Sequence, residues 1–153
     1  MDYKCFKNQY PDDQKNCCTE QGTTLVIDVP ENSVIYDGDK IFPDNSSCDC
    51  IIFFDRSTKV HIFPVELKSK SCDISQLEKK FVNTTNFISN LLNICCSKNK
   101  KIFFLPILIH KGIKSRFRIE QIYKLKIRYN GIGYNILLRR SNASLSEIVS
   151  EFS

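Results

Sequence analysis

Two β-type runs joined by a short polar segment restrict most strongly what this chain can fold into. The runs are Cys48–Phe54 and Val60–Lys68, both rich in Ile, Phe and Val, and Asp55-Arg-Ser-Thr-Lys59 separates them. Runs of this length and composition, divided by polar turn residues, are typical of neighbouring antiparallel strands. We therefore predict a β-hairpin over residues 48–68, around which the rest of the fold has to pack.

The segments after this hairpin show the pattern of a helix and then of a strand. Asp73 or Ser75 can cap a helix that runs to about Asn93, because apolar side chains recur every three or four residues along it. Residues 101–110 are almost continuously apolar, as expected of a strand that is buried on both faces. Together with a β-type run at Thr23–Val29, these segments predict an α/β fold with a mixed central β-sheet flanked by helices.

Two turn signals lie outside this central stretch. Tyr36-Asp-Gly-Asp39 predicts a turn within a hairpin over Ser33–Phe42. Asn130-Gly131 predicts a second hairpin, formed by strands at Ile119–Tyr129 and Gly133–Arg140. We therefore expect β-structure on both sides of the central segments.

The length and the charge of the chain set further limits. Because 153 residues supply one hydrophobic core, residues 1–153 are expected to form a single domain. Its core would span about 23–110, followed by a basic C-terminal hairpin and helix at about 119–152.

The formal net charge is +5, and residues 98–140 contain one acidic side chain, Glu120. A basic surface of this kind is compatible with a polyanionic partner.

The first hairpin brings two acidic side chains together if it turns within Asp55-Arg-Ser-Thr-Lys-Val60. With the two ends of that segment facing each other, Asp49 lies directly opposite Glu66, and Lys68 is on the same face two residues later. Carboxylates this close repel unless a cation lies between them, and hard oxygen ligands suit Mg²⁺ or Mn²⁺. Such an ion activates water and offsets charge on a phosphate, so the pattern favours hydrolysis of a phosphodiester bond.

The motif formed by Asp49, sixteen intervening residues and Glu66-Leu67-Lys68 resembles the D…(D/E)xK signature of the PD-(D/E)xK nuclease superfamily. The helix after the motif, with Gln76 near its start, is similar to the corresponding helix of RecB-like members. The resemblance implies a restriction-endonuclease-like core in which Asp49, Glu66 and the main-chain carbonyl of Leu67 hold the metal. It also implies catalytic roles for Lys68 and Gln76.

The resemblance covers roughly residues 23–110 and implies a Mg²⁺-dependent nuclease, with DNA favoured over RNA as its substrate. Many members carry a further acid in the site, for which Glu20 and Glu31 are the candidates. Two other classes of function stay open. One is a catalytically inactive module of the same fold that binds nucleic acid or protein. The other is a cysteine-rich metal or redox protein in which the motif is incidental.

Partners are suggested by the basic C-terminal half. Its clustered cations are candidates for contacts with nucleic acid phosphates. The residues expected to make them are Lys101, Lys111, Lys114, Arg116 and Arg118. Because the chain holds little beyond a catalytic core, a homodimer or a partner subunit is also compatible with this function.

The eight cysteines and the N-terminus bear on where the protein works. No two cysteines have the Cys-x2-Cys spacing typical of zinc or iron–sulfur sites, so free thiols in a reducing cytosol are favoured over a metal site. The polar N-terminal segment lacks the apolar core of a signal peptide, and no apolar stretch is long enough to cross a bilayer. We therefore expect an intracellular, cytoplasmic protein without a membrane partner.

Overall fold

The computed structural model describes residues 2–29, 32–56, 58–70, 72–95 and 100–152, in which short strands and helices are interleaved. In chain order the elements are α1 (Asp2–Asn8), the 3₁₀ turn η1 (Pro11–Asp13), β1 (Gln14–Lys15), β2 (Cys18–Glu20), β3 (Thr23–Val26), β4 (Ser33–Asp37), α2 (Gly38–Ile41), β5 (Cys50–Asp55), β6 (Lys59–Lys68), α3 (Ile74–Cys95), β7 (Lys101–Phe104), β8 (Ile107–His110), α4 (Arg116–Lys124), β9 (Lys126–Tyr129), β10 (Ile132–Asn135), β11 (Leu137–Arg140), β12 (Ala143–Ser144) and α5 (Leu145–Phe152).

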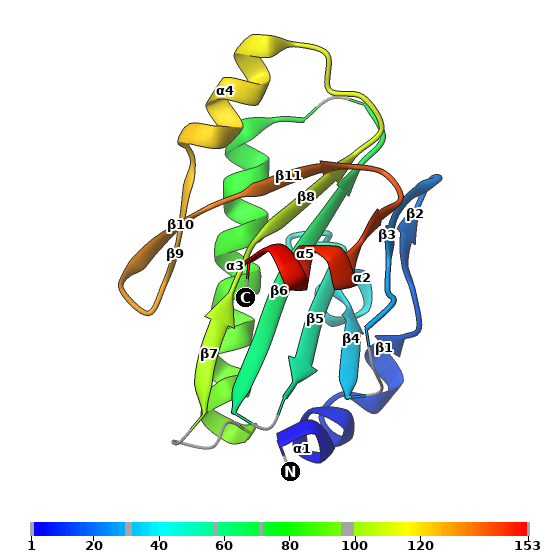
Figure 1. Cartoon of the computed structure of the whole chain (residues 1–153), viewed down its shortest axis with the longest axis vertical. Helices are drawn as coiled ribbons and strands as arrows, with labels where there is room; N and C mark the ends of the chain where they lie inside the picture. The colour runs from blue at the N-terminus through cyan, green and yellow to red at the C-terminus, as the bar shows by residue number, and fades with distance from the viewer. Residues whose placement is uncertain (1, 30–31, 57, 71, 96–99, 153) are drawn as a thin grey trace.

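A seven-stranded sheet organises these elements (Figure 1). Its strands follow the order β1-β4-β5-β6-β8-β11, and β7 also pairs with β6. The β4–β5 and β5–β6 pairs are antiparallel, whereas β7 and β8 run parallel to β6, and β11 runs parallel to β8. The sheet is therefore mixed, which confirms the predicted α/β class.

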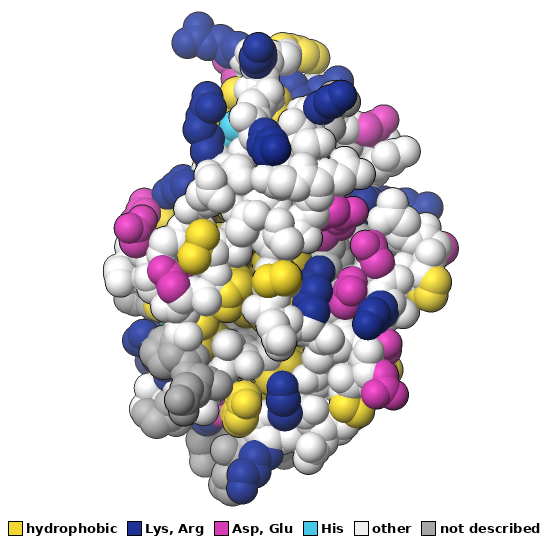
Figure 2. Space-filling model, turned by 90° about the vertical axis from the view of Figure 1, so that its right-hand side faces the viewer, with side chains coloured by type: hydrophobic (Ala, Val, Ile, Leu, Met, Phe, Trp, Pro, Cys, Tyr) yellow, Lys and Arg dark blue, Asp and Glu magenta, His cyan; other side chains and the backbone are white. Residues whose placement is uncertain are grey.

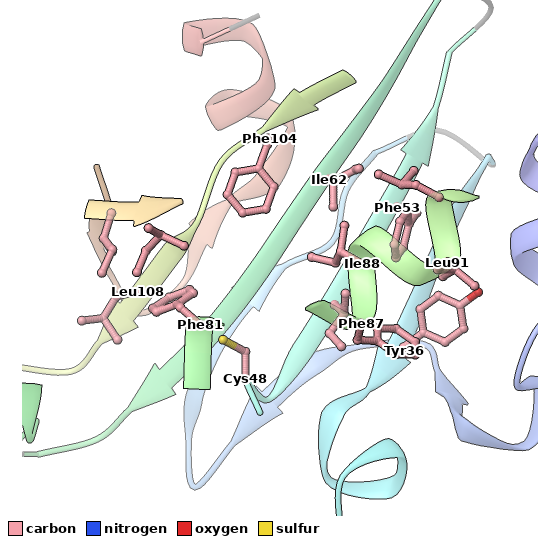
Figure 3. Close-up of a cluster of buried hydrophobic side chains, with 14 of the residues drawn as sticks. Tyr36, Cys48, Phe53, Ile62, Phe81, Phe87, Ile88, Leu91, Phe104 and Leu108 are labelled. Carbon is pink, nitrogen blue, oxygen red and sulfur yellow. The ribbon is translucent and has the colours of Figure 1, made fainter. Parts of the chain in front are cut away.

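The helix α3 covers one face of this sheet, and the larger of the two hydrophobic clusters lies between them (Figures 1 and 3). Aromatic and aliphatic side chains of the sheet, such as Phe53 and Ile62, meet Phe81 and Ile88 of the helix. The apolar stripe predicted for this helix is buried along its whole length. Asp73 caps the helix rather than Ser75, since its Oδ1 accepts a hydrogen bond from the backbone N–H of Gln76 at 3.2 Å.

The opposite face of the sheet is covered by α5 and by a small three-stranded sheet in the order β12-β3-β2. Leu25 of β3 and Leu145 of α5 pack there against apolar side chains of the central strands. As a result, every residue of β6 except its two terminal lysines is buried. A charged side chain within this strand therefore needs partners, because an unpaired buried charge is costly.

The register of the first hairpin is as predicted. Asp55 pairs with Val60, and the ladder continues to Cys50 opposite Val65. One further step along the two strands sets Asp49, just before β5, beside Glu66. Strong local patterning and a short polar turn were enough to specify this pairing.

Three other predictions of local structure were wrong. Ser33–Phe42 is not a hairpin, because Asp37 caps the short helix α2 by accepting a hydrogen bond from the N–H of Asp39 at 3.1 Å. The apolar run at 101–110 is interrupted at Leu105-Pro106, so it forms two strands, β7 and β8. The break falls at Pro106, which has no N–H to donate to a ladder, and the two strands pair with β6 in one continuous register.

The third error concerns the C-terminal half. Residues 116–124 form the helix α4 rather than a strand, because Ser115 caps it and Ile119 and Ile122 lie one turn apart facing the core. The hairpin at Asn130-Gly131 is present, but it is confined to β9 and β10. The chain then returns to the main sheet as β11, a long-range parallel pairing that local patterns do not reveal.

The cysteines correct the prediction of free thiols. Two disulfides form, Cys5–Cys95 and Cys18–Cys50. Cys17, Cys48 and Cys72 are free, and Cys96 lies outside the described residues. Disulfides persist mainly in oxidising surroundings, so the cysteines no longer support the expectation of a cytoplasmic protein. Within the part of the chain that the structure describes, none of the helices has the length and apolarity that a membrane span requires.

Candidate functional site

Asp49 and Glu66 form a buried carboxylate pair at one end of the β5–β6 hairpin. The backbone N–H of Asp49 donates to Glu66 Oε1 at 3.2 Å, and the N–H of Leu67 donates to Asp49 Oδ2 at 2.8 Å. The exposed fractions of the two residues are 4% and 0%. Each carboxylate is thus held by the backbone beside the other, as the register of the two strands requires.

Two lysines lie beside the second carboxylate oxygen of Glu66. Lys80 on α3 donates to Glu66 Oε2 at 2.8 Å, and Lys68 Nζ lies 3.4 Å from the same oxygen. Burial alone would lower the pKa of Lys80, but its hydrogen bond and its attraction to Glu66 raise the pKa above its ordinary value. Lys80 therefore stays charged and offsets the buried carboxylate.

Lys80 was not predicted, although the sequence carries a signal for it. It lies three residues after Leu77 and four before Thr84, so helical periodicity puts it on the buried face of α3. A lysine at such a position needs an acidic partner to remain charged. Glu66, already singled out on a buried strand, was the available partner.

Two further acids meet Asp49 from the other side. Carboxylate oxygens of Glu20, Asp39 and Asp49 all lie within 4.8 Å of one another. The hydrogen bond with Asp49 is the main cause that raises the pKa of Glu20 to about 7. Burial, together with the negative charge of Glu66, raises the pKa of Asp49 to about 6. These shifts are typical of carboxylates crowded together without enough positive charge.

Specific contacts bring each of these acids to Asp49. Glu20 stands on β2 two residues after Cys18, whose disulfide to Cys50 ties that strand to the start of β5. Asp39 follows Gly38, where a Cβ would lie 1.7 Å from the carbonyl oxygen of Cys48, so only glycine allows the close approach. Glu20 was one of two predicted candidates for an additional acid. The other, Glu31, lies outside the described residues.

The carboxylates open into a pocket of about 240 Å³. Figure 2 shows acidic side chains grouped on one face beside lysines, with further Lys and Arg side chains at the end of the molecule where Figure 1 draws α4. The pocket is lined by Glu20, Gln21, Asn45, Asp49, Glu66, Leu67, Lys68, Ser69, Lys70 and Lys80. Its polar lining and crowded carboxylates fit a small hard cation such as Mg²⁺ better than an apolar ligand.

Gln76 and the predicted basic residues are distributed unevenly around this pocket. Gln76 lies in the first turn of α3 and lines an adjoining pocket together with Lys68 and Lys80. Among the predicted nucleic acid contacts, Lys111 follows β8, where His110 pairs with Lys68, so it lies at the same end of the sheet. Lys114 and Arg118 line a different pocket that also adjoins the carboxylate pocket, and Arg116 is exposed on α4.

Lys101 is not brought together with the other residues. It pairs with Lys59 at the opposite end of β6 from Glu66. Parallel pairing between β6 and β7 fixes this separation, which the chain position of Lys101 did not reveal.

Comparison with known proteins leaves the site to be interpreted from its own chemistry. No family model, no curated protein and no solved structure matches the chain.

Proposed function

We propose that this protein is a metal-dependent nuclease with a restriction-endonuclease-like core of the PD-(D/E)xK type, which hydrolyses phosphodiester bonds with Mg²⁺ or Mn²⁺. One observation carries the proposal. Asp49 and Glu66 are buried side by side, with Glu20 and Asp39 adjoining them and Lys68 at the pocket. Carboxylates outnumber the lysines that contact them, and a divalent cation would balance the excess negative charge.

In this proposal Asp49 and Glu66 would hold the metal, and Glu20 and Asp39 are both close enough to Asp49 to add a further ligand. When bound, the ion would supply Lewis acidity toward a phosphate oxygen and a lower pKa for water. The carbonyl of Leu67 is a further candidate ligand on the resemblance alone, and Leu67 lines the pocket.

The lysines and Gln76 have separable roles in this proposal. Lys80 is the more buried of the two lysines at Glu66, so we assign it to balancing the charge of Glu66 and fixing its orientation. Lys68 is the more exposed of the two at the carboxylate pocket, so its ammonium group is available to a substrate phosphate. Gln76 lines the adjoining pocket and would contact the substrate there.

The substrate class follows from the charge around the pocket. Lys70, Lys111, Lys114, Arg116 and Arg118 are at or near this end of the sheet, and cations of this kind bind nucleic acid phosphates. We favour DNA over RNA because the resemblance points to DNA-cleaving members of the superfamily.

The test is cleavage of labelled single-stranded DNA, duplex DNA and RNA in Mg²⁺, Mn²⁺ and Ca²⁺. We expect cutting in Mg²⁺ and Mn²⁺, and binding without cutting in Ca²⁺, whose loose coordination activates water poorly. Glu66→Ala should abolish both cleavage and Mn²⁺ binding measured by calorimetry. Glu78→Ala, which removes an exposed acid from the same helix as Lys80, is the matched control and should behave as the wild type. Cleavage that survives Glu66→Ala would contradict the proposal.

A second function is favoured by one contact. Glu66 already has a 2.8 Å partner in Lys80 and a nearby Lys68, so its charge is balanced in part without a metal. A module that binds nucleic acid without cutting it would need no more than this. Binding of DNA with neither Mn²⁺ uptake nor cleavage would favour this second function.

A further inference from the structure

A second pocket adjoins the carboxylate pocket and differs from it in chemistry. It has a volume of about 410 Å³, within the usual range of small-molecule sites, and it shares Ser69 and Lys70 with its neighbour. These two residues follow directly after Lys68 and form the wall between the two pockets. A ligand that fills one pocket is therefore in reach of the other.

The inner part of this second pocket is apolar. Cys72 and Ile113 are buried in it, and burial raises the pKa of the Cys72 thiol, which keeps it neutral. Cys72 shares this pocket lining with Phe117 and Arg118 of α4, and it is also within electrostatic reach of Glu66 and Lys68. The pocket thus extends the opening of the carboxylate site toward α4.

Phe117 stands at the open side of this pocket. It is on the first turn of α4, which is anchored by the Ser115 cap and by the buried Ile122, and 68% of its surface is exposed. Single exposed apolar side chains are common on protein surfaces, but Phe117 also lines a pocket that holds the buried side chains of Cys72 and Ile113. Its ring is therefore accessible for stacking.

Cations surround the ring. Lys70, Lys114 and Arg118 line the same pocket, and none of the described residues that line it is acidic. The combination of an exposed aromatic ring, an apolar recess and a cationic rim is what single-stranded nucleic acid requires, because each base offers a face for stacking and each phosphate a negative charge.

We propose that this second pocket receives an unpaired base of a single-stranded nucleic acid, stacked on Phe117, and that it selects single-stranded over duplex substrate. This inference rests on the proposed nuclease function of the neighbouring pocket. A base in the recess leaves its phosphate near Lys70, on the wall shared with the carboxylates. A duplex keeps its bases stacked on one another and cannot offer a free face.

The test is the affinity of the full chain for labelled oligonucleotides in Ca²⁺, measured by fluorescence anisotropy. Phe117→Ala should weaken binding of single-stranded DNA about ten-fold, in the range measured for loss of one base stack. Binding of duplex DNA should change less than about two-fold, since stacking on Phe117 needs an unpaired base. Phe117→Trp should restore the preference for single strands. Tyr123→Ala removes another exposed aromatic ring of α4 that does not line the pocket, and it should have no effect.

A second measurement locates the base. Oligonucleotides that lack one base at each position in turn should bind the wild type less tightly at one position, and Phe117→Ala should abolish that difference. An equal loss for single strands and duplexes in Phe117→Ala would overturn the proposal, because it would indicate a general contact.

The outcomes separate the two proposals. If the wild type cuts DNA through Glu66 but Phe117→Ala binds single strands normally, the base site is wrong and the nuclease stands. If the wild type neither binds nor cuts any nucleic acid, both proposals fail. Binding to anionic lipid vesicles that depends on Phe117, and that oligonucleotides do not compete, would assign the ring to a membrane surface and overturn the base site.

Discussion

The β5–β6 hairpin buries an aspartate at each end, and the two carboxylates have very different charged neighbours. At the turn, Asp55 accepts a hydrogen bond from the backbone N–H of Tyr3 at 3.0 Å and pairs with Lys100. At the other end, Asp49 adjoins Glu66 and the carboxylates of Glu20 and Asp39, and these four acids outnumber the nearby lysines, which are Lys15, Lys68 and Lys80. The two aspartates are almost equally buried, with exposed fractions of 6% and 4%.

The comparison shows how a buried carboxylate with a structural role differs from one whose surroundings suit binding of a cation. Among the described residues, the Asp55 carboxylate has a backbone donor on one oxygen and a cation on the other, so its charge is balanced. Asp49 has other acids beside it at a pocket: burial and the charge of Glu66 raise the pKa of Asp49, and the hydrogen bond with Asp49 raises that of Glu20. Burial is common to both ends, so the excess of negative charge is the feature that points to function.

The largest effect is expected for the lysine at the carboxylate end of β6. Lys68→Ala should lower the rate of cleavage about 100-fold or more, the usual size for a group that stabilises developing charge, while Mn²⁺ still binds. Lys59→Ala, at the other end of the same strand, is the matched control and should leave cleavage unchanged. Rates from labelled DNA and Mn²⁺ affinities from calorimetry give the comparison. Equal effects of the two substitutions would remove the distinction between the two ends.

The next effect concerns the lysines that pair with the buried acids. Lys80→Met and Lys100→Met should each lower the free energy of unfolding by about 3 kcal/mol, because each leaves a buried carboxylate without its cation. Saturating Mn²⁺ should remove most of the deficit of Lys80→Met relative to the wild type, since the ion replaces the missing charge. It should not change the deficit of Lys100→Met. Urea unfolding with and without Mn²⁺ measures both, and Mn²⁺ rescue of both variants would contradict the comparison.

Sequence reasoning found the part of the site that depends on local pairing. The turn between Asp55 and Val60 and the period of two along a strand were sufficient to set Asp49 opposite Glu66. The cap of one helix set Gln76 near its start, whereas its role in the site was implied by the resemblance alone. Each of these inferences spans a short stretch of chain in which neighbours in sequence determine neighbours in space.

The rest of the site depends on contacts between distant segments. Glu20 reaches Asp49 through the small sheet and the Cys18–Cys50 disulfide, and Asp39 reaches it because Gly38 permits a close approach to the chain at Cys48. Neither contact leaves a periodic pattern. Lys80 differs from these acids because its contact could have been predicted from the sequence. It is a lysine on the otherwise apolar stripe of α3, and a buried lysine needs an acidic partner.

The disulfides extend the comparison, since there is one at each end of the hairpin. Cys5–Cys95 ties α1, which carries Tyr3, to α3, and Cys18–Cys50 ties β2 to β5. Replacing either pair with serine should lower the free energy of unfolding by about 2–3 kcal/mol. Only loss of Cys18–Cys50 should also weaken Mn²⁺ binding, because β2 carries Glu20. Mass spectrometry after alkylation should detect both bridges in the wild type, and free thiols at all four positions would contradict this.

The smallest effect is a pH dependence that belongs to the carboxylate end alone. With pKa values of about 6 for Asp49 and about 7 for Glu20, the folded protein without metal holds protons at pH 6 that a metal has to displace. Because both pKa values are raised, the stabilisation that these protons provide is lost as the pH rises through the two pKa values, and metal binding is favoured in the same pH range.

If both acids bind the ion, the fraction of molecules with both ionised rises about ten-fold between pH 6 and pH 7, and so should the Mn²⁺ affinity. Glu20→Gln should reduce this rise to about two-fold, the contribution of Asp49 alone. Asp55→Asn should leave the ten-fold rise unchanged, because its carboxylate is at the other end of the hairpin. Calorimetric titrations at the two pH values measure all three proteins, and a two-fold rise in the wild type would mean that Glu20 is not a ligand.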